Sequence, residues 1–171
     1  MGERPPVIFS FEDRLRPDAG AMVAKLKARG LAVHLLSGDR EAAVARVADQ
    51  LGIAIAKARA TPDAKVAYVE ALRHAGRKVV MVGDGINDAP ALAAGLTSIA
   101  PATASDVGRN AAEIIFMGDS SAAIAEAFPI GAASQRIAKE NFVLAVAYNV
   151  LAVPVAMAGL ASPLIAALAM S

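Results

Sequence analysis

A strand–loop–helix junction at residues 79–92 is the stretch that most constrains the fold of this chain. An apolar, β-branched run stops at a Gly-Asp-Gly turn around Asp84, and Pro90 then lies just inside a segment with helical spacing. Such a junction places polar groups at the carboxyl end of a buried strand, where open α/β sheets bind ligands. The carboxylates of Asp84 and Asp88 suit Mg²⁺, and the glycines let a phosphate approach the backbone. The stretch therefore predicts a site for a phosphate group and a hard cation.

The same junction recurs along the chain. Gly30, Gly52 and Gly76 each follow a segment with helical spacing and precede an apolar run, which is typical of repeated βα units and a parallel sheet. The expected strands are residues 7–11, 31–36, 53–58, 79–82, 97–100 and 113–117. Because such crossovers are right-handed, the loops after the strands lie on one edge. We therefore expect the loops at 37–39, 61–65 and 83–88 to face a shared cleft.

The charge pattern separates a polar part from an apolar tail. Hydrophobic residues make up 56% of the 171 residues, yet no Asp, Glu, Lys, Arg or His follows Glu140. About 20 apolar residues cross a bilayer core, so residues 141–159 predict one membrane helix and residues 163–171 the start of a second. Arg136 and Lys139 precede the first span, which places its start in the cytoplasm. Residues 129–131, Pro-Ile-Gly, predict a kinked or broken helix before the span.

Composition excludes other classes of function. A net charge of +1 and 4% aromatic residues argue against a nucleic-acid partner, which needs a basic patch or stacking platforms. The absence of Cys removes thiolate metal sites from this stretch. The N-terminus lacks the pattern of a secretory signal, so we expect the charged part to remain cytoplasmic.

Four motifs in order resemble the second half of the catalytic core of a heavy-metal P-type ATPase, followed by its last two membrane helices. They are Asp13-Arg14-Leu15-Arg16-Pro17, Ser37-Gly38-Asp39, Thr61-Pro62-Asp63-Ala64-Lys65 and residues 83–92. The resemblance implies ATP-driven metal transport through an aspartyl-phosphate intermediate on an α/β, haloacid dehalogenase-like fold. It divides the chain into a partial phosphorylation domain lacking its first strand (1–128), a connecting helix (129–140), a transmembrane helix (141–159) and a truncated second one (163–171).

The resemblance also assigns roles to single residues. Ser37 would hydrogen-bond a phosphoryl oxygen, and Lys65 would balance its charge. Asp84 would hold Mg²⁺, with Asn87 and Asp88 ordering the loop and the phosphoryl group or its water. The full implied set comprises Ser37, Gly38, Asp39, Lys65, Asn87 and Asp88 for catalysis, Gly83, Gly85, Asp13 and Arg16 for cofactor binding or the hinge to the nucleotide domain, and Asp84 and Asp88 for Mg²⁺.

The family's phosphorylated aspartate, in an Asp-Lys-Thr-Gly-Thr stretch, does not occur in this sequence. A nucleotide-binding insertion does not occur either. We therefore expect a fragment that is inactive alone, with ATP bound mainly by a domain outside it and with the N-terminal part of the same pump as its partner. Leu15 stands where a free-standing phosphatase of this fold would have a second Asp.

The apolar tail matches the copper branch of the family. Tyr148, Asn149 and Met170 would supply the thioether and oxygen ligands that suit Cu(I), although Tyr148 and Asn149 could equally join helices together. Residues 99–110 are similar to the copper ATPases that serve cytochrome oxidase assembly. The resemblance then implies a multi-pass protein of the inner membrane, with the lipid bilayer and a copper chaperone as partners. A zinc or cadmium pump and a catalytically silent, membrane-anchored dehalogenase-like domain remain the alternatives.

Overall fold

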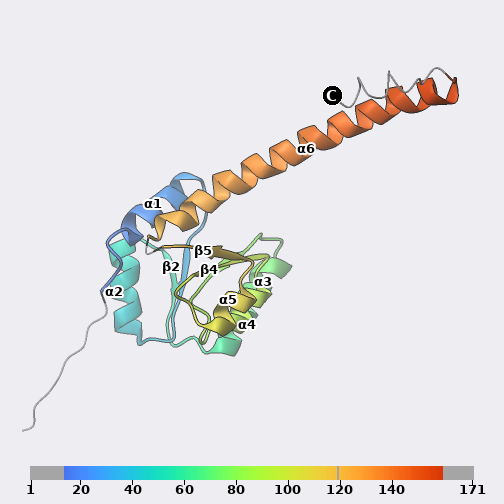
Figure 1. Ribbon diagram of the computed structural model, residues 1–171. Helices are drawn as coiled ribbons and strands as arrows, with labels where there is room; N and C mark the ends of the chain where they lie inside the picture. Colours follow the sequence, from blue (N-terminus) through green and yellow to red (C-terminus); the bar gives the residue numbers. More distant parts are fainter. Residues whose placement is uncertain (1–13, 119, 160–171) are drawn as a thin grey trace, which may run out of the picture. The chain divides into compact units, whose positions relative to one another are not determined.

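The computed structural model describes residues 14–118 and 120–159 (Figure 1). The elements in chain order are α1 (Ala19–Ala28), β1 (His34–Leu36), α2 (Glu41–Leu51), β2 (Ile55–Lys57), α3 (Pro62–His74), β3 (Val80–Val82), α4 (Ala89–Ala94), β4 (Thr97–Pro101), α5 (Asp106–Ala111), β5 (Ile114–Phe116) and α6 (Ala122–Met157). The chain divides into two compact units, Met1–Ala125 and Glu126–Ser171. The first unit thus ends three residues before the boundary predicted at residue 128.

All strand pairs in the described residues are parallel, as the repeated βα pattern predicts. The single sheet expected from the sequence is instead two separately bonded sheets, β1-β2 and β3-β4-β5. A sheet continues only where neighbouring backbones lie about 4.8 Å apart and exchange hydrogen bonds. In the described part of the chain, β1 and β3 exchange none. The expected strand at 7–11 lies outside the described residues.

Helix α3 begins where the sequence predicts it. Thr61 is the residue before the helix, and its side chain accepts a hydrogen bond from the backbone N–H of Ala64 at 3.3 Å, while Pro62 occupies the first helical position. Proline lacks the N–H that would be unpaired there, so the pair forms an efficient helix start. This start places Lys65 in the first turn of α3.

Two apolar clusters form the interior of the first unit. Val69, Met81, Ala91 and Leu92 pack between α3, β3 and α4. Val23, Ala48 and Ile53 pack where α1 and α2 meet the segment leading into β2. The clusters share no residue, so each of the two sheets has its own apolar support.

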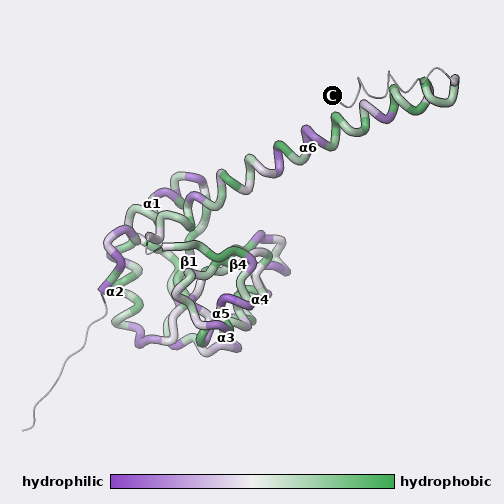
Figure 2. The backbone as a smooth tube through the Cα atoms, in the orientation of Figure 1, coloured by the Kyte–Doolittle hydropathy of each residue, from purple (hydrophilic) through white to green (hydrophobic). Residues whose placement is uncertain are grey.

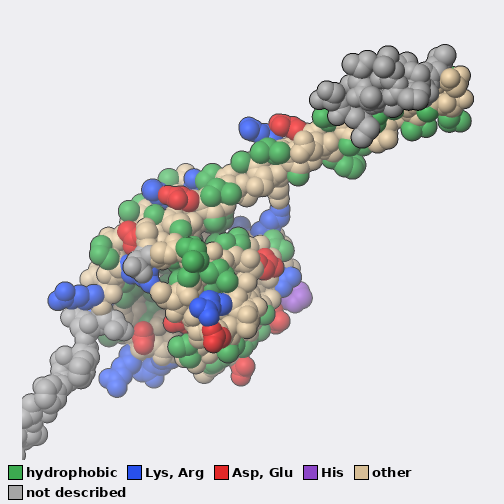
Figure 3. Space-filling view, viewed as in Figure 1, with side chains coloured by type: hydrophobic (Ala, Val, Ile, Leu, Met, Phe, Trp, Pro, Cys, Tyr) green, Lys and Arg blue, Asp and Glu red, His purple; other side chains and the backbone are tan. Residues whose placement is uncertain are grey.

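Helix α6 is continuous through Pro129 and Pro154, so of the kink or break predicted at residues 129–131, the break is excluded and the kink stays a prediction. A proline removes its own N–H from the ladder of helical hydrogen bonds, and its ring crowds the carbonyl one turn earlier, but the hydrogen bonds on either side keep the helix continuous. The helix is long and apolar enough to cross a membrane. Apolar colouring dominates its far part (Figure 2), and its charged side chains stop partway along (Figure 3). The expected second span at 163–171 lies outside the described residues.

Asp18 links the start of α1 to the start of α6 within the first unit. Its carboxylate accepts hydrogen bonds from the Ser120 hydroxyl at 2.8 Å and from the backbone N–H of Ala122 at 3.2 Å. The Ser120 bond, and to a smaller extent the backbone bonds, lowers the pKa of Asp18 below its usual 3.8. A carboxylate with a lowered pKa stabilises the fold above the pKa it has when unfolded, and the contribution is lost as the pH falls through the folded value.

We therefore expect Asp18→Asn to lower the Tm at pH 7, and the difference from the wild type to shrink as the pH falls below about 3.8. The measurement is a series of thermal melts from pH 7 to pH 2.5. Asp49→Asn on the exposed face of α2 is the matched control. A Tm difference for Asp18→Asn that stays constant over the whole series would contradict the linkage.

Candidate functional site

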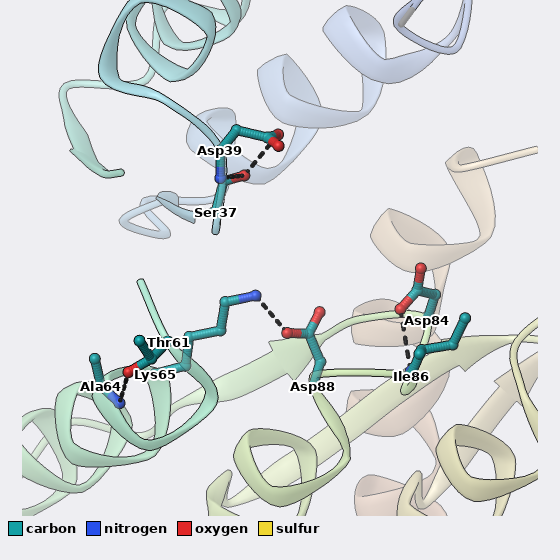
Figure 4. A network of polar contacts seen from close by, with 8 residues as sticks. All are labelled: Ser37, Asp39, Thr61, Ala64, Lys65, Asp84, Ile86 and Asp88. Atoms are coloured by element: carbon teal, nitrogen blue, oxygen red, sulfur yellow. Dashed lines mark hydrogen bonds and ion pairs between the residues drawn. The ribbon is translucent and has the colours of Figure 1, made fainter. Parts of the chain in front are cut away.

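An ion pair between α3 and α4 is the centre of the candidate site. The Nζ of Lys65 lies 2.5 Å from Oδ1 of Asp88, and the two side chains are only 9% and 19% exposed. Lys65 comes from the first turn of α3, and Asp88 is the residue immediately before α4. Figure 4 shows the ammonium of Lys65 pointing at the carboxylate of Asp88. The structure thus brings together two of the residues that the sequence predicts for catalysis.

The loop after β3 is held by a close backbone crossing. Gly85 has φ +83°, and a Cβ atom built on it would stand 1.8 Å from Cα of Gly108. The backbone N–H of Ser105 donates to the carbonyl oxygen of Asp84 at 3.2 Å. Gly83 also lies close to Asp88, where a Cβ would come within 2.9 Å of Cβ of Asp88. These contacts explain why the turn around Asp84 requires glycine on both sides.

The carboxylate of Asp84 makes its own hydrogen bond, separate from the bond between Lys65 and Asp88 (Figure 4). Its Oδ1 accepts the backbone N–H of Ile86 at 3.4 Å, and the residue is exposed. Asp88 already has Oδ1 engaged by Lys65, so Asp84 is the more available cation ligand of the two. That Asp88 also binds Mg²⁺ remains a prediction.

Ser37 and Asp39 form a second, separate part of the site. The Ser37 hydroxyl donates to Oδ2 of Asp39 at 2.9 Å and accepts the backbone N–H of Asp39 at 3.2 Å. This turn follows β1 directly, and the backbone N–H of Ala60 donates to the carbonyl oxygen of Ser37 at 2.9 Å. The backbone N–H of Ser37 also donates to the carbonyl oxygen of Lys57, the last residue of β2, at 2.9 Å, so the turn is attached to the end of β2. Figure 4 shows it apart from the Lys65–Asp88 pair, with no bond drawn between the two.

The carboxylates of the site fit a Mg²⁺ ion that is bound at the same time by a phosphate group and water. Among residues 14–118 and 120–159, no three His, Cys, Asp or Glu side chains gather closely enough to hold a metal ion by themselves. Mg²⁺ usually keeps several waters and is bound by one or two carboxylates together with substrate phosphate oxygens. Asp84 offers one such carboxylate, so the site suits Mg²⁺ that arrives with a phosphoryl group.

Several predicted site residues are placed without a test of their roles. Asn87 is exposed in the loop before α4, and Arg16 is exposed in the segment before α1. Tyr148 and Asn149 both lie on α6. Asp13 and Met170 lie outside the described residues.

Sequence reasoning missed the residues that hold the Asp84 loop from the opposite side. Ser105 caps α5 by accepting the backbone N–H of Gly108 at 3.1 Å, and its own backbone N–H holds Asp84. A Ser before a short helix does predict a cap. Nothing in the local sequence signals that this cap lies against a loop about twenty residues earlier.

Comparisons with known proteins show what this chain is similar to. A family model described as a haloacid dehalogenase-like hydrolase matches residues 3–95. The nitrogen fixation protein FixI of Rhizobium leguminosarum bv. viciae is 52% identical over 163 residues, which are 95% of this chain and 21% of that protein. The copper-exporting P-type ATPase of Mycobacterium leprae is 41% identical over 164 residues, which are 96% of this chain and 21% of that protein.

A solved structure of a zinc-transporting PIB-type ATPase is similar to this one. The TM-score is 0.80 at 30% identity, over 92% of this chain and 26% of that one. The chain thus spans about a fifth of the length of the curated relatives that it matches.

The crossing of Gly85 and Gly108 yields a test with a matched control. Gly85→Ala and Gly30→Ala both place a side chain at positive φ, but only the Cβ at Gly85 meets other atoms. We expect Gly30→Ala to cost roughly 1 kcal/mol through its backbone alone. Gly85→Ala should cost clearly more, because the backbone at Gly108 must move. Denaturant titration measures both, and equal losses would show that the crossing is loose.

The Lys65–Asp88 pair yields a second test. A double-mutant cycle with Lys65→Met and Asp88→Ala should give a coupling free energy of about 2 kcal/mol, because a charged hydrogen bond with little exposure to water is weakly screened. The exposed Arg59–Glu41 pair, at 3.9 Å, is the control, with an expected coupling below about 0.5 kcal/mol. Similar coupling in the two pairs would mean that Lys65 and Asp88 do not form the contact described.

Proposed function

The chain belongs to the haloacid dehalogenase-like hydrolases and, among them, to the heavy-metal P-type ATPases, and on that premise we propose that it is the C-terminal part of an ATP-driven Cu(I) pump. In this proposal an aspartate outside the chain accepts the γ-phosphoryl group of ATP. The residues described here bind that group, and α6 contributes to the path of the metal. The chain alone is then inactive, because its sequence lacks the Asp-Lys-Thr-Gly-Thr stretch.

The Lys65–Asp88 pair beside Asp84 is the observation that carries the proposal. An ammonium group has three donors. Asp88 takes one of them, so two remain for phosphoryl oxygens. Asp88 also holds the ammonium group in place. The positive charge of that group then neutralises the negative charge of the phosphoryl group. Mg²⁺ held by Asp84 would neutralise further charge on the phosphoryl oxygens, which is most of what phosphoryl transfer asks of a protein.

The Ser37 turn supplies the remaining contact in this proposal. Its hydroxyl donates to Asp39 at 2.9 Å, and rotation of the hydroxyl hydrogen would let it donate to a phosphoryl oxygen instead. Asp39 therefore keeps the Ser37 side chain oriented until a phosphoryl group arrives. Gly38 lies between the two residues of this turn.

The chemistry of α6 supports Cu(I) as the transported ion. From residue 141 to the end of the helix at Met157 there is no charged side chain, whereas a site for a hard or doubly charged ion would be expected to contain carboxylates. The Nδ2 group of Asn149 donates to the carbonyl oxygen of Ala145 at 2.8 Å. The Oδ1 atom of Asn149 is left for a ligand role, and Tyr148 is the preceding residue of the same helix. Met170 would add a thioether.

The remaining parts of the proposal follow from the same premise. The relatives are membrane P-type ATPases, and α6 is apolar over about 25 Å beyond its last charge, close to the thickness of a bilayer core. We place the pump in the inner membrane, as a multi-pass protein with the first unit in the cytoplasm and a copper chaperone as metal donor. Zinc transport is the second candidate, because a zinc-transporting ATPase shares the fold over 92% of this chain.

The test measures metal-stimulated ATP hydrolysis by the full-length pump in membranes. We expect stimulation by Cu(I) under reducing conditions and none by Zn²⁺. Asn149→Leu should lower the Cu(I)-stimulated rate at least tenfold, because it removes an oxygen ligand from an apolar span. Leu151→Ala, on the same exposed helix, should leave the rate unchanged.

Each other outcome decides against one part of the proposal. Stimulation by Zn²⁺ without Cu(I) would assign the chain to a zinc pump. No stimulation by any metal, together with no phosphoenzyme, would assign it to a silent dehalogenase-like domain. An unchanged rate in Asn149→Leu would remove α6 from the metal path and leave the residue as a contact between helices.

A further inference from the structure

The candidate site is divided between two parts of the first unit. Ser37 and Asp39 follow β1, which pairs only with β2 and is supported by the cluster around Val23 and Ile53. Lys65, Asp84 and Asp88 belong to α3 and the loop after β3, supported by the cluster around Val69 and Leu92. In the described residues the two sheets are not hydrogen-bonded to each other. The backbone hydrogen bond from Ala60, the residue before the cap of α3, ties the Ser37 turn to the start of that helix, and side-chain contacts between α3 and the β1-β2 sheet set the rest of the placement of Ser37 relative to Lys65.

Tyr68 makes such contacts. Its phenol oxygen lies 2.9 Å from Nδ1 of His34 on β1, and the two rings are tilted against each other with centroids 5.9 Å apart. The ammonium of Lys57 on β2 lies 5.3 Å from the centre of the Tyr68 ring, within reach of a cation–π interaction. Tyr68 itself is on α3. One side chain thus connects α3 to both strands of the β1-β2 sheet.

The positions of these residues relate the contact to the site. Tyr68 follows Lys65 by three residues, which is close to one turn of α3. His34 precedes Ser37 by three residues, along β1 and into the turn. A bond between Tyr68 and His34 therefore joins the two elements within a short distance of the groups that would contact a phosphoryl group. The contact is half-buried, so water weakens it less than it would weaken a surface pair.

We propose that Tyr68, through its hydrogen bond to His34 and its contact with Lys57, is a positioning residue that sets the Ser37 hydroxyl relative to the Lys65 ammonium. This inference rests on the proposed function, because it concerns the same phosphoryl site. In this proposal Tyr68 contacts neither phosphate nor metal and acts only through the two elements that it joins. Loss of the phenol hydroxyl should let the Ser37 turn drift relative to Lys65 and weaken the binding of any ligand that needs both.

Orthovanadate is the probe, because it resembles a phosphoryl group in transfer and would contact Ser37 and Lys65 together. The measurement is its half-inhibitory concentration against Cu(I)-stimulated ATP hydrolysis by the full-length pump. Tyr68→Phe keeps the ring over Lys57 and removes only the hydroxyl. We expect it to raise the half-inhibitory concentration about three- to tenfold, the range set by the loss of one hydrogen bond. A variant that merely lowers the amount of folded pump changes the rate but not this concentration.

His34→Leu and the double variant complete the design. If the two residues act through their mutual bond, His34→Leu raises the half-inhibitory concentration by a similar factor, and the double variant raises it no further than either single one. His74→Leu, exposed near the end of α3, is the matched control and should change nothing.

Two results would overturn the inference while leaving the proposed function intact. One is normal vanadate inhibition in both single variants, and the other is a double variant whose effect is the product of the two single ones. A wild-type pump that hydrolyses ATP without vanadate inhibition, or shows no metal-stimulated hydrolysis, would instead overturn the proposed function, and this inference with it.

Discussion

The ion pair between Lys65 and Asp88 is the contact on which the rest of the site depends. Holding two charges where water has little access is costly unless their geometry is good. Here the geometry is provided by apolar packing: Val69 on α3 and Leu92 on α4 are each 1% exposed and hold the two helices together just beyond the pair. The charged pair thus depends on the apolar cluster, because neither helix end would be held in place without the packing.

The second part of the site is attached differently. The turn at Ser37 is held by backbone hydrogen bonds to the end of β2 and by its own Asp39. These neighbouring groups fix the orientation of the turn. Its distance from Lys65 depends instead on how the two sheets, each with its own apolar cluster, are joined. A ligand that contacts both parts would itself help to hold them together. In such a site, the binding of a phosphoryl group and the arrangement of the domain depend on each other.

The physical constraint on helix α6 differs from the one on the first unit. Phe142, Leu144 and Leu151 are each more than two-thirds exposed, which a protein surrounded by water tolerates poorly over so long a surface. A bilayer removes this conflict, and the helix satisfies the backbone groups of the span internally except where Pro154 has no N–H to donate. The amide of Asn149 follows the same rule, because its N–H bonds back to Ala145.

The local sequence was sufficient to predict most of the helices and strands. Thr61 and Pro62 start a helix, Gly52 ends one in the left-handed conformation, and apolar runs form the parallel strands. These features depend on neighbours a few residues away, which the sequence displays directly. Of the kink or break predicted at residues 129–131, the break did not occur, because the hydrogen bonds on either side of a single proline keep a long helix continuous.

Within the site, the sequence alone determined which polar residues stand at the ends of strands and the starts of helices, namely the carboxylates, the amine and the hydroxyl to which the proposal assigns the chemistry. Only the tertiary structure decided their partners: Asp88 with Lys65, Gly85 against Gly108, and Tyr68 with His34. The structure also showed two sheets where one was expected. The reason is physical, since a helix cap or strand is specified by interactions within about a turn of the chain. A contact between residues more than twenty positions apart is specified by how whole elements pack, and no local pattern records that.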